Sequence, residues 1–238
     1  MASPALAPIL KLVDKWAAAA VDKRTGREAE VLREAVALSF ASYGACSLVT
    51  VQLRLNLASS LQLLADATLD NKEHKSLSKE WVDLISEDVL PVLMLRWDDG
   101  TLLPGRCEHD EVEFNCHLIR SASKNTGQFR GSATSQRNAA AFMAPLVGYG
   151  ALCCAAHLVL MMVTAHLSDG QPMFPEGPLL TRLREFVFLA IDAVKPCTAV
   201  CCCDIRSGVA LGKLTDIVTA GLRQCCHRRS TRVQHFLI

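Results

Sequence analysis

Aromatic residues are scarce in this chain, at 5 % of its 238 residues, although half of all its residues are hydrophobic. The core must therefore be built mainly from Leu, Val and Ala. Stacked helices use such side chains, whereas a β-sandwich depends on β-branched and aromatic ones. The hydrophobic content excludes an intrinsically disordered chain, and the length is sufficient for a substantial core. The composition predicts an all-α fold.

An excess of either charge is also lacking, since 25 Lys and Arg stand against 24 Asp and Glu. The chain as a whole is therefore not suited to bind a polyanion, and we predict no nucleic-acid partner. One local run, residues 119–137, is basic but holds a single aromatic residue, and single-strand binding surfaces need more. We interpret it as a solvated interaction loop for a protein partner, with phosphate contact or phosphorylation as open alternatives. Its candidate residues are Arg120, Lys124, Phe129, Arg130 and Arg137.

The common catalytic motifs are missing. The sequence contains no G-x-S-x-G, no G-x-x-x-x-G-K-[ST], no H-E-x-x-H and no G-x-G-x-x-G. The nearest approach, Gly148-Tyr149-Gly150, lacks the third glycine and a preceding strand. We predict a non-enzymatic protein without a cofactor.

Cysteine is abundant, with 11 residues, but its arrangement does not fit a disulfide scaffold. The number is odd, and neighbouring cysteines pair with each other only under strain. The N-terminus also lacks the basic region of a secretory signal. We expect reduced thiols in the cytoplasm or nucleus, mostly buried or lipid-modified. The candidates for lipidation are Cys201, Cys202 and Cys203.

One short segment brings cysteine and histidine together: Cys107, His109, Cys116 and His117. Zinc requires four tetrahedral ligands, which proteins supply from tight turns with spacings such as C-x₂₋₄-C. The spacing C-x-H-x₆-C-H matches none of the usual ones. These four residues are weak metal candidates, and we interpret them as polar loop residues beside buried thiols.

Helical periodicity runs through most of the chain, and about seven or eight helices are expected. Residues 70–75 are predicted to be a solvated turn, and Pro91 to kink or interrupt the fourth helix. Consecutive helices joined by short polar turns predict a multi-helix array, and stacked helix pairs of a HEAT- or armadillo-like α-solenoid would produce this pattern. No repeat aligns at a fixed period. The clearest expected helices are 5–21, 27–43, 47–69, 76–89, 92–97, 179–194 and 209–222.

Changes in composition divide the chain into four parts. Residues 1–97 form an N-terminal helical unit, 98–138 a polar and basic insertion or loop, 139–223 a C-terminal helical unit, and 224–238 a basic tail. Within the insertion, residues 112–118 alternate apolar and polar side chains as a strand does. They also fit helical spacing, and the absence of a partner strand favours helix.

No charged residue stands between Arg137 and Asp169, and most of this segment is apolar. It can be the buried centre of a helical protein, or residues 144–165 can span an intracellular membrane. We favour the buried core. The predicted function is a helical scaffold or adaptor for protein–protein interaction, with a membrane-associated helical protein as the alternative. An abrupt change after Arg223 raises the further hypothesis of a fragment or isoform of a larger helical-repeat protein.

Overall fold

The computed structural model describes residues 3–21, 25–102 and 106–126, together with positions 151, 155, 158–159, 177–178, 181–186 and 189. The chain divides into two units, Met1–Ala151 and Leu152–Ile238. The described parts contain helices and no strands, so the predicted all-α class is confirmed. Six α-helices form a multi-helix array in the first unit. Neither a solenoid arrangement nor a count of seven or eight helices is confirmed.

The first three helices begin and end where local signals place them. They are α1 (Leu6–Val21), α2 (Thr25–Tyr43) and α3 (Leu48–Ala67). Gly44 ends α2 with a φ of +79°, which L side chains rarely adopt, and its N–H donates to the carbonyl of Phe40 at 2.9 Å. Ser47 begins α3, because its Oγ accepts a hydrogen bond from the N–H of Val49 at 3.3 Å.

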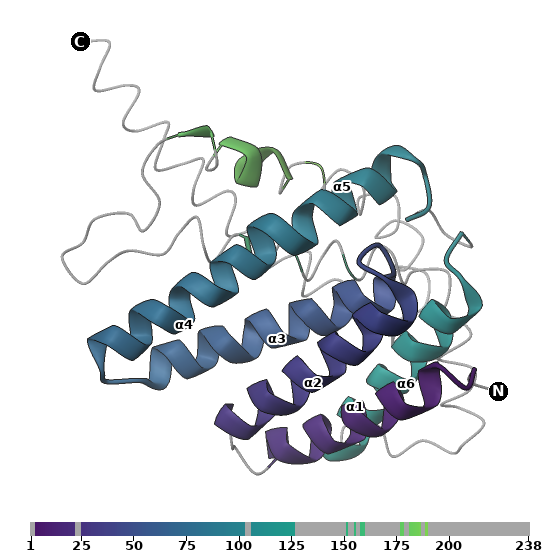
Figure 1. The fold of residues 1–238 in the computed structure, drawn as a ribbon, viewed down its shortest axis with the longest axis horizontal. Coiled ribbons are helices and arrows are strands. Elements are labelled where there is room, and N and C mark those ends of the chain that lie inside the picture. Colours follow the sequence, from purple (N-terminus) through teal and green to yellow (C-terminus); the bar gives the residue numbers. More distant parts are fainter. Residues whose placement is uncertain are drawn as a thin grey trace, which may run out of the picture. The chain divides into compact units, whose positions relative to one another are not determined.

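Helix α3 lies at the centre of this unit, packing against α2, α4 and α6. Its apolar residues fall on more than one side of the helix, as the sequence suggests for a central element. The polar positions Thr50, Arg54 and Ser60 are buried with them. In Figure 1, α1, α2, α3 and α4 lie side by side in chain order.

The fourth helix differs from the expectation at both ends. Helix α4 (Asn71–Asp83) begins where a turn was predicted, because the carboxylate of Asp70 accepts from the N–H of Lys72 at 2.8 Å and caps it. It continues into a π-helical segment, η1 (Leu84–Val89), and then into α5 (Leu90–Asp98). Pro91 lies in the first turn of α5, where a missing N–H is tolerated. The wider π turn precedes the proline, and α4, η1 and α5 follow one another without a break in the helical backbone.

The predicted insertion contains a sixth helix, α6 (His109–Thr126). The helical reading of residues 112–118 is therefore confirmed, and the strand alternative is wrong. Helix α6 packs against α1 and α3, so it closes the array beside the first helix (Figure 1). The proposed boundaries at 97, 138 and 223 remain predictions.

In the second unit the described positions are few. Ala155, Leu158 and Val159 are helical and buried. Ala151, in the first unit, is also helical and buried. Residues 181–186 are helical with Leu183 and Phe186 buried, which agrees with the amphipathic helix expected there. None of the helices in the described part of the chain is long and apolar enough to cross a membrane. Most of the 144–165 segment lies outside that part.

Candidate functional site

A buried ion pair joins the C-terminal end of α5 to the first turn of α6. Two guanidinium nitrogens of Arg96 donate to the two carboxylate oxygens of Glu111, at 2.5 Å and 3.0 Å. Arg96 is 9 % exposed and Glu111 is 2 % exposed. Two parallel, charge-assisted hydrogen bonds of this kind fix the orientation of both side chains.

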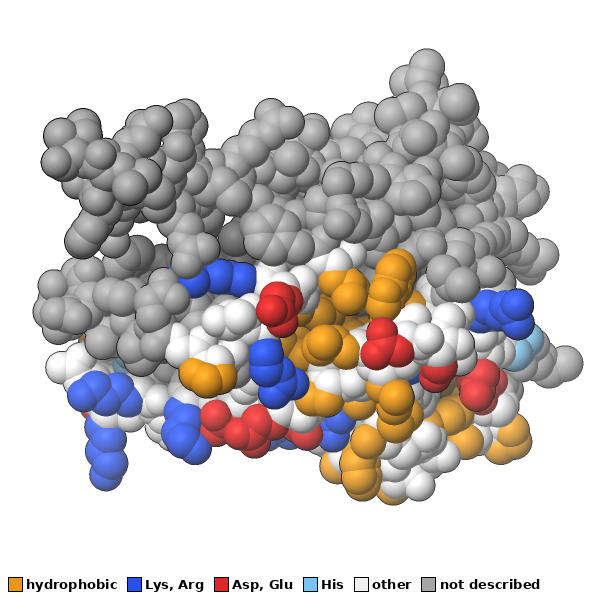
Figure 2. Space-filling model, turned by 90° about the horizontal axis from the view of Figure 1, so that it is seen from above, with side chains coloured by type: hydrophobic (Ala, Val, Ile, Leu, Met, Phe, Trp, Pro, Cys, Tyr) orange, Lys and Arg blue, Asp and Glu red, His pale blue; other side chains and the backbone are white. Residues whose placement is uncertain are grey.

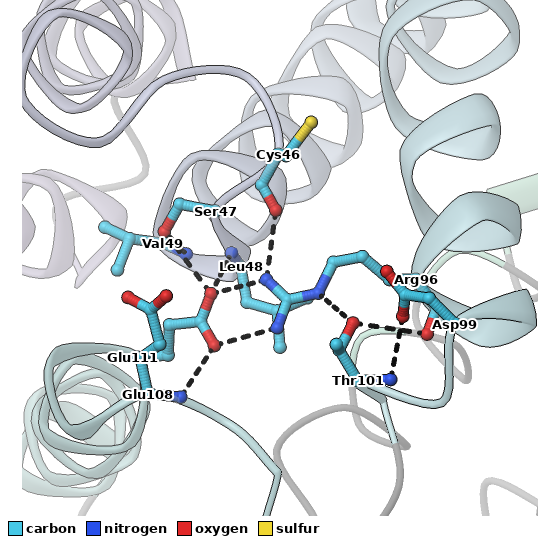
Figure 3. A network of polar contacts seen from close by, with 9 residues as sticks. All are labelled: Cys46, Ser47, Leu48, Val49, Arg96, Asp99, Thr101, Glu108 and Glu111. Carbon is cyan, nitrogen blue, oxygen red and sulfur yellow. Dashed lines mark hydrogen bonds and ion pairs between the residues drawn. The ribbon is translucent and has the colours of Figure 1, made fainter.

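The carboxylate of Glu111 also caps two helices (Figure 3). Its Oε1 accepts from the backbone N–H of Leu48, in the first turn of α3, at 2.8 Å. Its Oε2 accepts from the N–H of Glu108 at 3.1 Å, just before α6. The second contact is half of a capping box, in which a glutamate in the first turn reaches back to the residue before the helix. One carboxylate thus satisfies N–H groups at the start of both helices.

Arg96 is held by further contacts that do not involve α6. Its Nε donates to Thr101 Oγ1 at 3.2 Å, and its Nη1 donates to the carbonyl of Cys46 at 3.0 Å. The turn that carries Thr101 is itself fixed, because the N–H of Thr101 donates to Asp99 at 2.8 Å. Figure 3 shows these groups converging on the guanidinium from opposite sides. The donors around Glu111 form a site that binds a carboxylate.

Two smaller polar clusters join α6 to other parts of the first unit, one to Ser3 before α1 and Tyr43 at the end of α2, the other to α1. In the first, Asp110 Oδ2 accepts from Ser3 Oγ at 2.5 Å and from the hydroxyl of Tyr43 at 2.8 Å. The hydrogen bond from Ser3, with a smaller contribution from Tyr43, holds the pKa of Asp110 below its usual value. Burial is the main reason that the pKa of Tyr43 is raised.

In the second cluster Asp14 on α1 lies against two residues of α6. His117 Nε2 is 2.9 Å from Asp14 Oδ1, and Ser121 Oγ donates to the same oxygen at 2.7 Å. A serine, a histidine and an aspartate are thus in contact, but the aspartate lies between the other two. In a catalytic triad the histidine occupies that position and takes the proton of the serine. This cluster therefore joins two helices and does not activate Ser121.

The four metal candidates do not converge on one point. His109 is exposed at the start of α6, Cys116 is buried on that helix, Cys107 precedes it, and His117 faces Asp14. In the described part of the chain, no group of three or more His, Cys, Asp or Glu side chains could hold a metal ion.

The other predicted site residues are only partly described. Arg120 and Lys124 lie within α6, so at these two positions the backbone is helical where a loop was expected. The remaining candidates lie outside the described residues: Phe129, Arg130, Arg137, Cys201, Cys202 and Cys203.

Apart from His117, which was named as a metal candidate, the residues of the clusters were not identified from the sequence, although two signals could have pointed to the buried pair. Arg96 is the one cation in the otherwise apolar run of residues 89–97, and Glu111 stands three residues after Glu108, the spacing of a capping box. The chain matches none of the protein-family models, curated proteins or solved structures with which it was compared.

Proposed function

We propose that this chain is a non-enzymatic helical scaffold or adaptor that binds a protein partner through helix surfaces of its first unit. The observation that carries the proposal is the exposure of large hydrophobic side chains on several of these helices. Phe40 on α2 is 51 % exposed, Leu63 on α3 is 52 % exposed, and Leu95 on α5 is 57 % exposed. Figure 2 shows hydrophobic side chains gathered on one face, with acidic and basic ones around them. Exposed apolar side chains that gather on one face of a protein are typical of protein-binding surfaces.

Phe40 has the features of an interface anchor. Its ring lies over the guanidinium of Arg54, 5.7 Å from the ring centroid to the carbon, so the ring is held from below. Arg54 in turn contacts Asp88 of η1, with 3.7 Å between the charged atoms. A half-exposed aromatic ring on a fixed cation loses little conformational freedom when a partner covers it, and aromatic residues are enriched among interface hot spots.

Site-specific photo-crosslinking in cells tests the proposal. A photoreactive amino acid would replace Phe40 or Leu95, and Lys72, exposed in the first turn of α4, would serve as the control position. We expect a discrete crosslinked product at position 40 or 95 that is absent at position 72. The proposal is wrong if neither position yields a product beyond that of the control.

Carbonate extraction of cell membranes tests the alternative, a membrane-associated protein anchored through residues 144–165. Release of the full chain into the supernatant would exclude that alternative. Retention in the pellet would favour it over the scaffold.

A further inference from the structure

We propose that the partner surface that covers Phe40 carries an acidic side chain, whose carboxylate pairs with Arg54 of α3. The inference rests on the proposed scaffold function and deepens it, because it states the charge of the partner at this anchor. The observation behind it is a buried arginine whose hydrogen-bonding groups are incompletely paired beside a half-exposed aromatic ring.

Arg54 and Arg96 are both buried in the first unit, at 7 % and 9 % exposure, but they are paired very differently. Arg96 donates two short hydrogen bonds to one carboxylate, at 2.5 Å and 3.0 Å, and further ones to Thr101 and Cys46 (Figure 3). Arg54 is paired with Asp88, whose carbonyl oxygen lies 3.5 Å from Nη1 and whose carboxylate lies 3.7 Å from Nη2. The buried Nε of Arg54 has no hydrogen-bond partner in the described part of the chain.

The loose pairing of Arg54 leaves capacity for a second carboxylate. A guanidinium is stable away from water only when its charge and its N–H groups are paired. The distance of 3.7 Å to Asp88 is well beyond the usual length of a charge-assisted hydrogen bond, about 2.7–2.9 Å. Arginine can also form two parallel hydrogen bonds with one carboxylate. An acidic group from outside the chain therefore finds donors that the fold has not fully used.

The tip of the Arg54 side chain lies close to the surface. The side chain of Asp88 is 46 % exposed, so the carboxylate that meets Nη2 is itself in contact with solvent. The ring of Phe40, with its centroid 5.7 Å from the guanidinium carbon, is also half exposed. A partner that covers Phe40 can therefore bring a carboxylate to Nη2 from the side of Asp88.

A partner on Phe40 also strengthens such a pair. The removal of water from the ring lowers the effective dielectric constant beside it, and an ion pair becomes stronger as that constant falls. Aromatic residues and arginines are enriched among interface hot spots, in pockets from which water is excluded. A cationic partner would instead pair with Asp88, leave Arg54 without a counter-ion and be repelled by its charge.

Photo-crosslinking from Ala37 tests the inference while Phe40 and Arg54 stay intact. Ala37 is exposed on α2, three residues before Phe40, and therefore lies on the same face of the helix. A photoreactive amino acid at this position of the full-length chain in cells gives a product whose partner segment is identified by mass spectrometry. We expect an Asp or Glu within about one helical turn of the crosslinked position. Its replacement by the corresponding amide in the partner should lower the yield at least about tenfold.

Two substitutions in the chain separate an acidic partner from a basic one. Asp88→Asn removes the internal competitor for Arg54 and should raise the yield about threefold, because a pair with so exposed a carboxylate is weak. Arg54→Met keeps an apolar stem but removes the charge, and should lower the yield at least about tenfold. Glu80→Gln is the control, since it opens the exposed pair with Arg33 and should leave the yield unchanged.

A lower yield with Asp88→Asn, an unchanged yield with a folded Arg54→Met, no product at Ala37, or a partner segment that offers lysine or phosphoserine without Asp or Glu would overturn the inference. If Arg54→Met does not fold, the direction of the effect of Asp88→Asn decides, because that position is half exposed. A product at Phe40 or Leu95 that is indifferent to these substitutions would support the scaffold function and overturn this inference alone. No product at any of the three positions would overturn both.

Discussion

Replacing Glu111 with leucine removes the acceptor on which α3, α5 and α6 meet. Loss of one member of a buried ion pair costs about 3–5 kcal/mol, because the other charge is left without a partner. The N–H of Leu48, in a residue that is 2 % exposed, loses its acceptor as well, which adds about 1–3 kcal/mol. The sum approaches the whole stability of an ordinary domain, about 5–15 kcal/mol. We therefore expect Glu111→Leu to leave the first unit largely or wholly unfolded in mild denaturant.

The double variant Arg96→Met/Glu111→Leu separates the two contributions. No charge is then left buried, and exchange of a buried pair for apolar side chains is often neutral or stabilising. The N–H of Leu48 still lacks an acceptor, whereas Glu108 is exposed and its N–H can bind water. The double variant should therefore recover most of the loss and remain about 1–3 kcal/mol less stable than the wild-type chain.

Urea unfolding followed by tryptophan fluorescence measures both variants. All three tryptophans, Trp16, Trp81 and Trp97, lie in helices of the first unit, so the signal reports that unit. The exposed pair of Arg33 and Glu80 is the control, and Glu80→Leu should cost less than about 1 kcal/mol. A double variant as stable as the wild-type chain would refute the capping role of Glu111. A double variant no more stable than Glu111→Leu alone would refute the assigned cost of the unpaired charge.

Three further predictions concern single residues. Burial raises the pKa of Glu28 above its value in the unfolded chain, so the protein loses stability as the pH rises from the unfolded pKa through the folded one. Glu28→Gln should therefore raise the urea midpoint at pH 7 and have no such effect in acid, below the unfolded pKa. The pKa of Asp110 is lowered, so its contribution is present above the unfolded pKa and disappears as the pH falls through the folded one. Asp110→Asn should cost about 1–3 kcal/mol at pH 7 and progressively less toward acid, and a loss independent of pH would contradict this. Gly44→Ala should cost about 1–2 kcal/mol because Gly44 has a positive φ, whereas Gly26→Ala, within helix α2, should stabilise the protein by up to about 1 kcal/mol. Thermal unfolding compares the two variants, and a change of Tm in the same direction for both would refute the argument.

The ends of the helices were predictable wherever a local signal was strong. Gly44 and Ser47 mark the end of α2 and the start of α3, and the structure agrees with both. The start of α4 was missed because its first turn is polar and shows no apolar periodicity, although Asp70 is a good cap. At Pro91 the sequence allowed either a kinked helix or an interrupted one, because it does not show that a π turn precedes the proline.

The polar contacts between distant helices were not predictable in the same way. Leu48 and Glu111, which share a hydrogen bond, are 63 residues apart, and Ser3 and Asp110 are 107 residues apart. The sequence marked Cys107, His109, Cys116 and His117 as metal candidates, and one of these residues, His117, belongs to a polar cluster instead. The structure brings His117 to Asp14 rather than to the two thiols.

By itself the sequence determined that the described chain is helical and where most of its helices begin and end, because capping and periodicity act over only a few residues. Tertiary structure decided which carboxylate meets which donor, and so placed Arg96 of α5 and Asp14 of α1 against residues of α6. Such contacts join residues far apart in the chain, so they depend on how α1, α3 and α5 pack and on the direction in which each helix face points.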